Sequence, residues 1–164
     1  MLKLISRLYQ PTGNGTIHVF GQDINDVCVD DVMTVMEQKN IMFEGTIAEN
    51  LRLGLGEQIE SDKSSEESLQ EACLVAAAWG DLQSISKGKV WEHDVGFRGK
   101  RINGGLSQRI NIARCVLRGK PLLLLDEPMS AQDDATTHQL GEMFRDLETK
   151  DDKGNVVPVT TLMI

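Results

Sequence analysis

Residues that crosslink small proteins or bind transition metals are scarce in this chain. Its 164 residues include three cysteines, Cys28, Cys73 and Cys115, and three histidines that form no ligand pattern. The cysteines are odd in number, widely spaced and without a CxxC pair, so they indicate neither a disulfide framework nor a zinc site. A reducing compartment fits best. A chain of this length can bury a substantial core without crosslinks, and we expect one domain or most of one.

Long hydrophobic runs are also missing. The longest lie around residues 73–79 and 122–125, far short of the roughly 20 apolar residues that a membrane helix needs. We therefore expect this chain not to span a bilayer by itself. The first residues also lack the apolar region and the cleavage site of a secretory signal.

Positive charge is in deficit, because 17 Lys and Arg face 25 Asp and Glu and give a formal net charge of −8. Surfaces for nucleic acids or anionic membranes need clustered Lys and Arg. No basic stripe occurs here, so we expect no nucleic-acid partner. Many acidic residues, among them Glu57 and Glu60, gather before residue 72, where we interpret them as a solvated loop and helix face. Aromatic residues make up only 4%, but 40% hydrophobic residues are ordinary for a soluble globular protein.

Hydrophobic periodicity and turn residues predict alternating helices and strands. The first half is predicted to contain a helix carrying Leu2, Ile5, Leu8 and Tyr9, a turn at 11–15, a strand at 16–20, a turn at 21–23 and a buried strand at 32–36. Two helices follow, one from a capping box of Ser64 and Glu67 to Gly80 and one from 104 to 119. The last part is predicted to contain a strand at 122–125, a helix capped by Asp133 or Asp134, a charged turn at 149–155 and a buried strand at 156–164. Strands that alternate with helices favour an α/β fold with a mostly parallel sheet. The first helix begins without a cap, so we expect the chain to be cut there.

The run PLLLLDEP at residues 121–128 is the most informative segment. Four leucines predict a strand buried on both faces, and Asp126 and Glu127 follow it where a parallel sheet opens its ligand crevice. Asp126 is suited to holding Mg²⁺, and Glu127, which points the other way, to polarising an attacking water. The alternative is an ordinary core strand followed by two solvated acids.

Gly104 and Gly105 open the helix that precedes this strand. Their backbone N–H groups and the helix dipole are suited to approaching an anion, because no Cβ intervenes. The alternative is that Asn103 caps the helix and the glycines merely form its entry turn.

Taken together, these stretches resemble the nucleotide-binding domain of exporter-type ATP-binding cassette (ABC) transporters, in an order and spacing that hold across nearly the whole chain. The matching stretches are NGGLSQRINIAR (103–114) with the signature LSGGQ-x-QRxxxAR, PLLLLDEP (121–128) with Walker B, SAQD (130–133) with the SALD of the D-loop, Gln38 and IMFEGTIAEN (41–50) with the Q-loop and its continuation, and HDVGFRG (93–99) with TEVGERG.

The resemblance implies a P-loop NTPase-like α/β fold with an inserted helical subdomain. Its parts are residues 1–46 with core strands and Q-loop, 47–104 as helical subdomain, and 105–164 with signature helix, Walker B, D-loop and the following strand. ATP and Mg²⁺ are the implied cofactors. The implied partners are a second nucleotide-binding domain and the transmembrane domains of a transporter. The implied location is the cytoplasmic face of a membrane, or the cytoplasm for the chain alone.

The resemblance also assigns roles to single residues. They are Gln38 as metal and water sensor and as link to the transmembrane domains, Asp126 on Mg²⁺, Glu127 as general base, Asn103, Gly104 and Gly105 on the γ-phosphate of ATP held by the opposite subunit, and Ser130 and Asp133 in the D-loop at the dimer interface.

The chain departs from the family pattern at several points. Asn103 replaces Ser but can still donate a hydrogen bond, Leu106 replaces Gln and cannot, and Gln132 replaces the usual D-loop Leu. The phosphate loop GxxxxGKS/T occurs nowhere. By the family pattern we expect the chain to begin just beyond that loop, and to stop at residues 160–164 before the switch histidine. Without the phosphate cradle we expect negligible ATP hydrolysis by this polypeptide alone.

The leading hypothesis is a partial nucleotide-binding domain of a transporter, whose parent activity couples ATP hydrolysis to transport. Two alternatives remain. One is a regulatory or dimerisation module that lends Gly104 and Gly105 to a partner's ATP without hydrolysing its own. The other is a chromosome-maintenance ATPase, which would need a long heptad-rich coiled coil that residues 50–100 do not contain.

Overall fold

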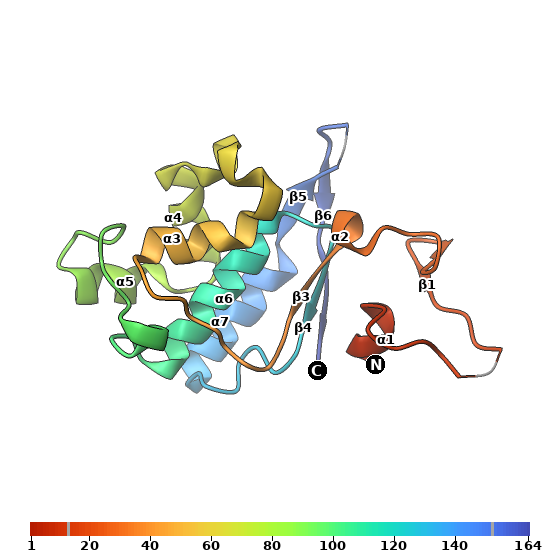
Figure 1. Cartoon of the computed structure of the whole chain (residues 1–164), viewed down its shortest axis with the longest axis horizontal. Helices are drawn as coiled ribbons and strands as arrows, with labels where there is room; N and C mark the ends of the chain where they lie inside the picture. The colour runs from red at the N-terminus through yellow and green to blue at the C-terminus, as the bar shows by residue number, and fades with distance from the viewer. Residues whose placement is uncertain (13, 152) are drawn as a thin grey trace.

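The computed structural model describes residues 1–12, 14–151 and 153–164, without the side chains of Glu57, Gln58 and Glu60. Gly13 and Asp152 of the two predicted turns, and the carboxylates of Glu57 and Glu60 in the predicted acidic face, therefore lie outside the description. The elements of the remaining chain are drawn in Figure 1.

A three-stranded sheet forms the centre, with strands β3 (Met33–Met36), β4 (Leu122–Leu125) and β7 (Thr160–Met163) in the order β3-β4-β7. Both pairings are parallel, and Leu125 lies opposite Met36 on one side and Met163 on the other. The predicted mostly parallel α/β fold is confirmed. Since the register is level, the carboxyl ends of all three strands meet at one edge.

Strand β4 is buried along its whole length, as its leucine run predicts. Leu122 and Leu124 pack with Leu2, Val19 and Met33 on one face. Leu123 and Leu125 point the other way, into the main helical core. Figure 1 shows the corresponding layers, with α1 (Leu2–Ile5) and β1 (His18–Val19) on one side of the sheet and the longer helices on the other.

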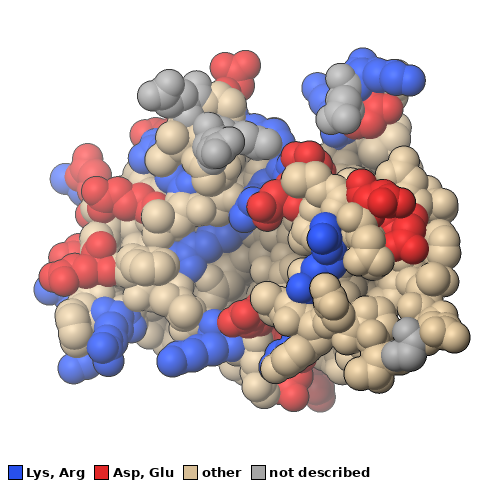
Figure 2. Space-filling model, turned by 45° about the vertical axis from the view of Figure 1, so that its right-hand side comes forward, with Lys and Arg blue, Asp and Glu red and all other residues tan. Residues whose placement is uncertain are grey.

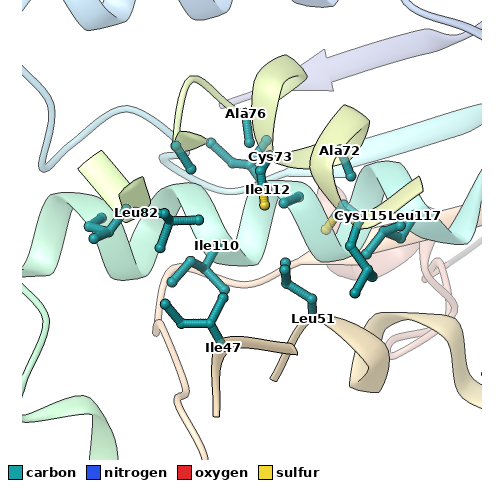
Figure 3. Packing of buried hydrophobic residues seen from close by; sticks show 14 of the residues in the cluster. Ile47, Leu51, Ala72, Cys73, Ala76, Leu82, Ile110, Ile112, Cys115 and Leu117 are labelled. Atoms are coloured by element: carbon teal, nitrogen blue, oxygen red, sulfur yellow. The ribbon is translucent and has the colours of Figure 1, made fainter. Parts of the chain in front are cut away.

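Helix α6 (Gly104–Arg118) is the centre of the helical side. Figure 3 shows its apolar residues between Ile47 and Leu51 of α3 (Ile47–Arg52) on one side and Cys73 of α4 (Glu66–Val75) on the other. The remaining helices are α2 (Val29–Val32), η1 (Leu53–Glu60), η2 (Asp62–Ser64), α5 (Trp79–Ser86), η3 (Phe97–Gly99) and α7 (Asp134–Arg145).

Both predicted ends of α6 and the predicted start of α7 are confirmed. The Asn103 side chain accepts a hydrogen bond from the Leu106 N–H, and Gly119 closes α6 in the left-handed conformation. Asp133, one of the two predicted caps, accepts from the N–H of Thr136 at the start of α7. Gly119 thus marks where the loop before β4 begins, and Asp133 marks where the loop after β4 ends.

The predicted beginning of the fold is wrong in two details. Helix α1 stops at Ile5 because Arg7 has a φ of 59°, so Leu8 and Tyr9 are exposed instead of continuing its face. Residues 21–23 are not simply a turn, because β2 (Gln22–Asp23) pairs with β1. The turn lies at Phe20 and Gly21, whose positive φ values of 50° and 81° suit a tight hairpin.

The helix predicted from Ser64 to Gly80 is two helices. Ser65, not Ser64, caps α4 by accepting from the Ser68 N–H. Ala77 has a φ of 51°, which separates α4 from α5, and Gly80 lies inside α5. The capping box of this region is instead at the start of α3, where Thr46 and Glu49 satisfy each other's backbone N–H.

The predicted last strand is also divided. Strand β5 (Glu148–Lys150) pairs antiparallel with β6 (Val156–Pro158), and β7 begins only at Thr160. Strand β7 forms the edge of the sheet in the described chain, so Met163 is 42% exposed. The β-branched residues thus mark a hairpin arm and an edge strand rather than one buried strand.

Shortening a leucine of β4 tests the central position of this strand. We expect Leu124→Ala to lower the free energy of unfolding by about 3 kcal/mol, because Leu124 is fully buried and the cavity cannot collapse between two packed layers. Leu74→Ala is the matched control, because Leu74 is 45% exposed on α4, and we expect a loss below about 1 kcal/mol. Urea unfolding measures both, and equal losses would contradict the packing described here.

Candidate functional site

Polar residues gather at the carboxyl edge of the sheet, where β3 and β4 end. The N–H of Asp126 donates to the carbonyl of Met36 (3.0 Å), and the N–H of Glu127 donates to that of Ile164 (2.8 Å). The chain leaving β4 is therefore tied to the ends of both neighbouring strands. This arrangement holds both carboxylates beside Gln38, two residues beyond β3.

Gln38 and Glu127 are in direct contact. The Nε2 of Gln38 donates to the Oε2 of Glu127 at 2.8 Å, across 89 positions of sequence. Glu127 has a φ of 48°, a conformation that L-residues rarely adopt. Its carbonyl accepts from the Nε2 of Gln108 (2.9 Å) and from the Oγ of Ser130 (3.1 Å), which hold it there. Backbone strain of this kind clusters at functional sites.

Asp126 faces a hollow of about 250 Å³ that Gln38 also lines, together with Lys3 and Ser6 of the N-terminal segment. The Nε2 of Gln38 donates to Glu127, and its Oε1 has no hydrogen-bond partner within the described part of the chain. A carboxylate and an amide oxygen at the rim of a hollow fit Mg²⁺, which takes few protein oxygens and completes its shell with water and phosphate. Within the described ranges no three His, Cys, Asp or Glu side chains gather into a richer metal site.

The turn before α6 presents bare backbone. A Cβ on Gly104 would meet nothing within 4 Å, whereas one on Gly105 would lie 2.9 Å from the carbonyl oxygen of Ala131. Among the described residues, no group accepts from the N–H of Gly104 or Gly105. This turn can therefore receive an anion at a helix N-terminus. Leu106 does not take part, because its side chain is fully buried in the core.

The loop 130–133 is joined to α6 through Gln108, a residue to which no role was assigned from sequence. Gln108, 1% exposed, donates to the Glu127 carbonyl and to the Oγ of Ser130, and its Oε1 accepts from the N–H of Ala131 (3.2 Å). Asp133 is occupied as the α7 cap, and the N–H of Thr136 holds the pKa of its carboxyl below the usual range. The contacts of Gln108 with residues 127–131, which lie far from it in the sequence, show that it holds this loop.

The structure thus brings Gln38, Asp126 and Glu127 together at one edge of the sheet. Gln108 joins this edge to the turn that carries Asn103, Gly104 and Gly105. Figure 1 shows the beginning of α6 and the loop after β4 at the same end of the molecule as the C-terminus. The catalytic and binding roles of these residues stay predictions.

Comparison with known proteins agrees with this geometry. Residues 1–130 match the family model of the ABC transporter. The chain belongs to the ABC transporter family. Its fold matches a solved bacterial Atm1-family ABC exporter with ATP bound, with a TM-score of 0.77 and 28% identity over 99% of this chain and 26% of that one.

Relatives among curated proteins are ABC transporters as well. The chain is 35% identical to ABC transporter 1 of Ajellomyces capsulatus over 92% of this chain, and 33% identical to the ATP-dependent lipid A-core flippase of Thiobacillus denitrificans over 81%. It spans 11% and 22% of the length of these two relatives. No helix in the described ranges combines the length and apolarity needed to cross a bilayer.

A second polar network of this ABC domain holds residues 40–43, which follow Gln38 in the chain. Arg114 donates from Nε to the carbonyl of Asn50 (2.7 Å), from Nη2 to the Oδ1 of Asn50 (2.7 Å) and from Nη1 to the carbonyl of Ile41 (2.6 Å). Asn50 in turn bonds both backbone groups of Phe43. Burial lowers the pKa of Arg114 to about 10, which still leaves it charged at neutral pH. Arg114 and Asn50 both occur in the motifs recognised from sequence, but the sequence does not show that the two side chains are in contact.

The segment held by this network exposes large apolar side chains. Ile41 and Phe43 are 48% and 53% exposed, and Phe97 of the HDVGFRG segment is 56% exposed. All three line one hollow, with Arg98 beside the Phe97 ring. Figure 2 shows Lys and Arg mixed with Asp and Glu on the face that it draws, with no single basic area. An apolar patch of this kind is typical of a protein–protein contact.

Breaking the Arg114 network tests whether it orders residues 40–43. We expect Arg114→Ala to accelerate amide exchange at Phe43 and to cost roughly 2 kcal/mol of stability, because several charge-assisted hydrogen bonds are lost. Arg118→Ala, one turn further along α6, removes only a 3.9 Å ion pair with Asp30 and should cost less than about 1 kcal/mol. Unchanged exchange at Phe43 would rule out the ordering role.

Replacing Asn103 tests whether this residue, which differs from the family's serine, still caps α6. We expect Asn103→Ala to lower the free energy of unfolding by about 1 kcal/mol, because the Leu106 N–H loses its acceptor. Asn103→Ser, which restores the family residue, should keep most of the stability, since Ser caps as well as Asn. Chemical unfolding of the three proteins measures this, and an Ala variant as stable as wild type would contradict the cap.

Proposed function

We propose that this chain forms the signature, Walker B and Q-loop part of an exporter nucleotide-binding domain that couples ATP hydrolysis to transport across a membrane. The hydrogen bond between the Gln38 amide and the Glu127 carboxylate, beside the hollow that Asp126 faces, is the observation that carries this proposal. The hydrogen bond holds two metal-binding oxygens, from Asp126 and Gln38, close to a base, Glu127, at the edge where parallel sheets bind nucleotides.

The residues divide the chemistry of hydrolysis between them. Glu127 accepts the proton of the water that attacks the γ-phosphorus, and Gln38 orients Glu127 through their hydrogen bond. Asp126 and the Oε1 of Gln38 would hold Mg²⁺, which neutralises phosphate charge when it is bound. ATP is the nucleotide used by ATP-binding domains of this family, and Mg²⁺ is its proposed partner here.

The signature turn serves a second nucleotide-binding domain. The N–H groups of Gly104 and Gly105, which have no acceptor in the described part of the chain, would bind the γ-phosphate of ATP held by that partner, with Asn103 keeping the turn in place. Ser130 and Asp133 would lie at the same dimer interface. Leu106 adds no contact, because its side chain is buried.

The apolar patch of Ile41, Phe43 and Phe97 supports a docking role for the transmembrane domains of the transporter. This patch would place the chain at the cytoplasmic face of a membrane. We propose residues 47–104, which include Phe97, as the helical subdomain, while Ile41 and Phe43 of the patch belong to the segment that precedes it.

The sequence contains no GxxxxGKS/T phosphate loop, so we propose that this polypeptide alone hydrolyses ATP negligibly. A second candidate function is regulatory. A chain with an open signature turn is suited to stimulating a competent partner without turning over ATP itself. The accessible N–H groups of Gly104 and Gly105 favour this regulatory reading.

Two variants separate the two functions in the assembled transporter. If Glu127 is the base, Glu127→Gln should lower kcat for ATP about 100-fold or more. If the chain is a regulatory module, turnover should survive Glu127→Gln and fall with Gly104→Ala, because the added methyl group obstructs the phosphate. The Ala side chain has open space, so the fold should be intact. Glu127-dependent turnover by the isolated chain would refute the proposed inactivity.

A further inference from the structure

Gln132 stands where the family pattern has a leucine, and its amide bridges two elements. Its Nε2 donates to the carbonyl of Gly105 at 2.9 Å and to the Oε1 of Gln108 at 2.8 Å. A Cβ on Gly105 would lie 3.4 Å from the Oε1 of Gln132. The side chain therefore lies against the signature turn, where a leucine could donate to neither acceptor.

The bridge has only one consistent orientation. The Oε1 of Gln108 accepts from Gln132 and from the N–H of Ala131, while its Nε2 donates to Glu127 and Ser130. Turning the Gln108 amide over would place donors against donors and acceptors against acceptors. Because Gln108 is buried, such a mismatch could not be relieved by water.

The bonds form one continuous connection, from the Glu127 carbonyl through Gln108 and Gln132 to the Gly105 carbonyl. One end is the residue proposed as the base, and the other is the peptide that follows the signature glycine. The loop between them packs so closely that Ala131 would clash with any side chain at Gly105. The Glu127 carbonyl and the Gly105 carbonyl are therefore held by the same connected pair of amide side chains.

We propose that Gln132 is a positioning residue, which fixes the signature turn relative to Glu127 and so presents Gly104 and Gly105 to the partner's ATP. The proposal rests on the proposed function of this turn. Position 106 supplies no amide, because leucine has no polar group and its side chain is buried in the core. Gln132 supplies an amide to the same turn from the D-loop.

The test uses a partner nucleotide-binding domain that carries its own phosphate loop and switch histidine but has its signature glycines replaced. ATP turnover in a mixture of the two then depends on the signature turn of this chain. Gln132→Glu keeps the size of the side chain but turns its donor into an acceptor facing Gly105 and Gln108. Gln139→Glu, on the exposed surface of α7, makes the same chemical change away from the bridge.

We expect Gln132→Glu to lower kcat of the mixture about tenfold with little change in KM for ATP, because positioning matters most when charge develops on the phosphate. In the isolated chain, the amide of Ala131 should exchange at least about tenfold faster, since its acceptor on Gln108 loses its support. Gln132→Leu should shift both quantities in the same direction, and Gln139→Glu should shift neither.

The outcomes separate the two claims. If the wild-type chain raises the partner's turnover and Gln132→Glu does so equally well, Gln132 has no positioning role and the function of the signature turn stands. Unchanged exchange at Ala131 would overturn the bridge itself. If the wild-type chain fails to raise the partner's turnover, the proposed signature function is wrong and the positioning role falls with it.

Discussion

Strand β4 is buried on both faces, and this burial decides where the polar groups of the domain can stand. Leu122–Leu125 places no polar side chain inside the sheet, so the first carboxylates occur where the strand ends. Both neighbouring strands are parallel to β4 and end level with it, and the chain leaving β3 therefore brings Gln38 to the same edge. The contact between Gln38 and Glu127 is a product of this topology, because 89 positions separate the two residues.

One buried amide then ties that edge to the helical side. A carboxamide that loses its hydrogen bonds on burial costs several kcal/mol, and Gln108 avoids this cost by bonding four groups in the loop after β4. The loop cannot move away from α6 without leaving that amide unsatisfied. The unusual backbone of Glu127 is thereby maintained by the core of the domain, and the position of a surface carboxylate depends on the packing of α6.

The parts of the fold that depend on local chemistry could be predicted from sequence. The caps Asn103 and Asp133, the left-handed Gly119 and the leucine strand each carry their signal within a few residues. The predictions failed where a positive φ at an ordinary residue, such as Arg7 or Ala77, ends a helix that its apolar spacing would continue. They also failed for residues 156–164, because β-branched composition does not distinguish a buried strand from an edge strand.

The candidate site divides along the same line. Asp126, Glu127, Gln38 and the signature glycines were predicted from motifs, because their spacing along the chain carries the pattern. Gln108 and Arg114 lie within those motifs, but their partners are up to 73 positions away, so only the folded chain shows what they hold. The replacement of the usual leucine by Gln132 did not predict any role, and only the hydrogen bond to the Gly105 carbonyl indicates one.

The departures from the family signature differ in what they affect. The change at position 106 lies in the core, since Leu106 is fully buried, and it leaves the outer surface of the turn as bare backbone. An anion site made of peptide N–H groups depends on the direction of those groups and not on the neighbouring side chains. The direction is set by the Asn103 cap at one end and by the bonds from the D-loop at the other. A signature of altered sequence can therefore keep a backbone geometry that is suited to an anion, provided that both supports remain.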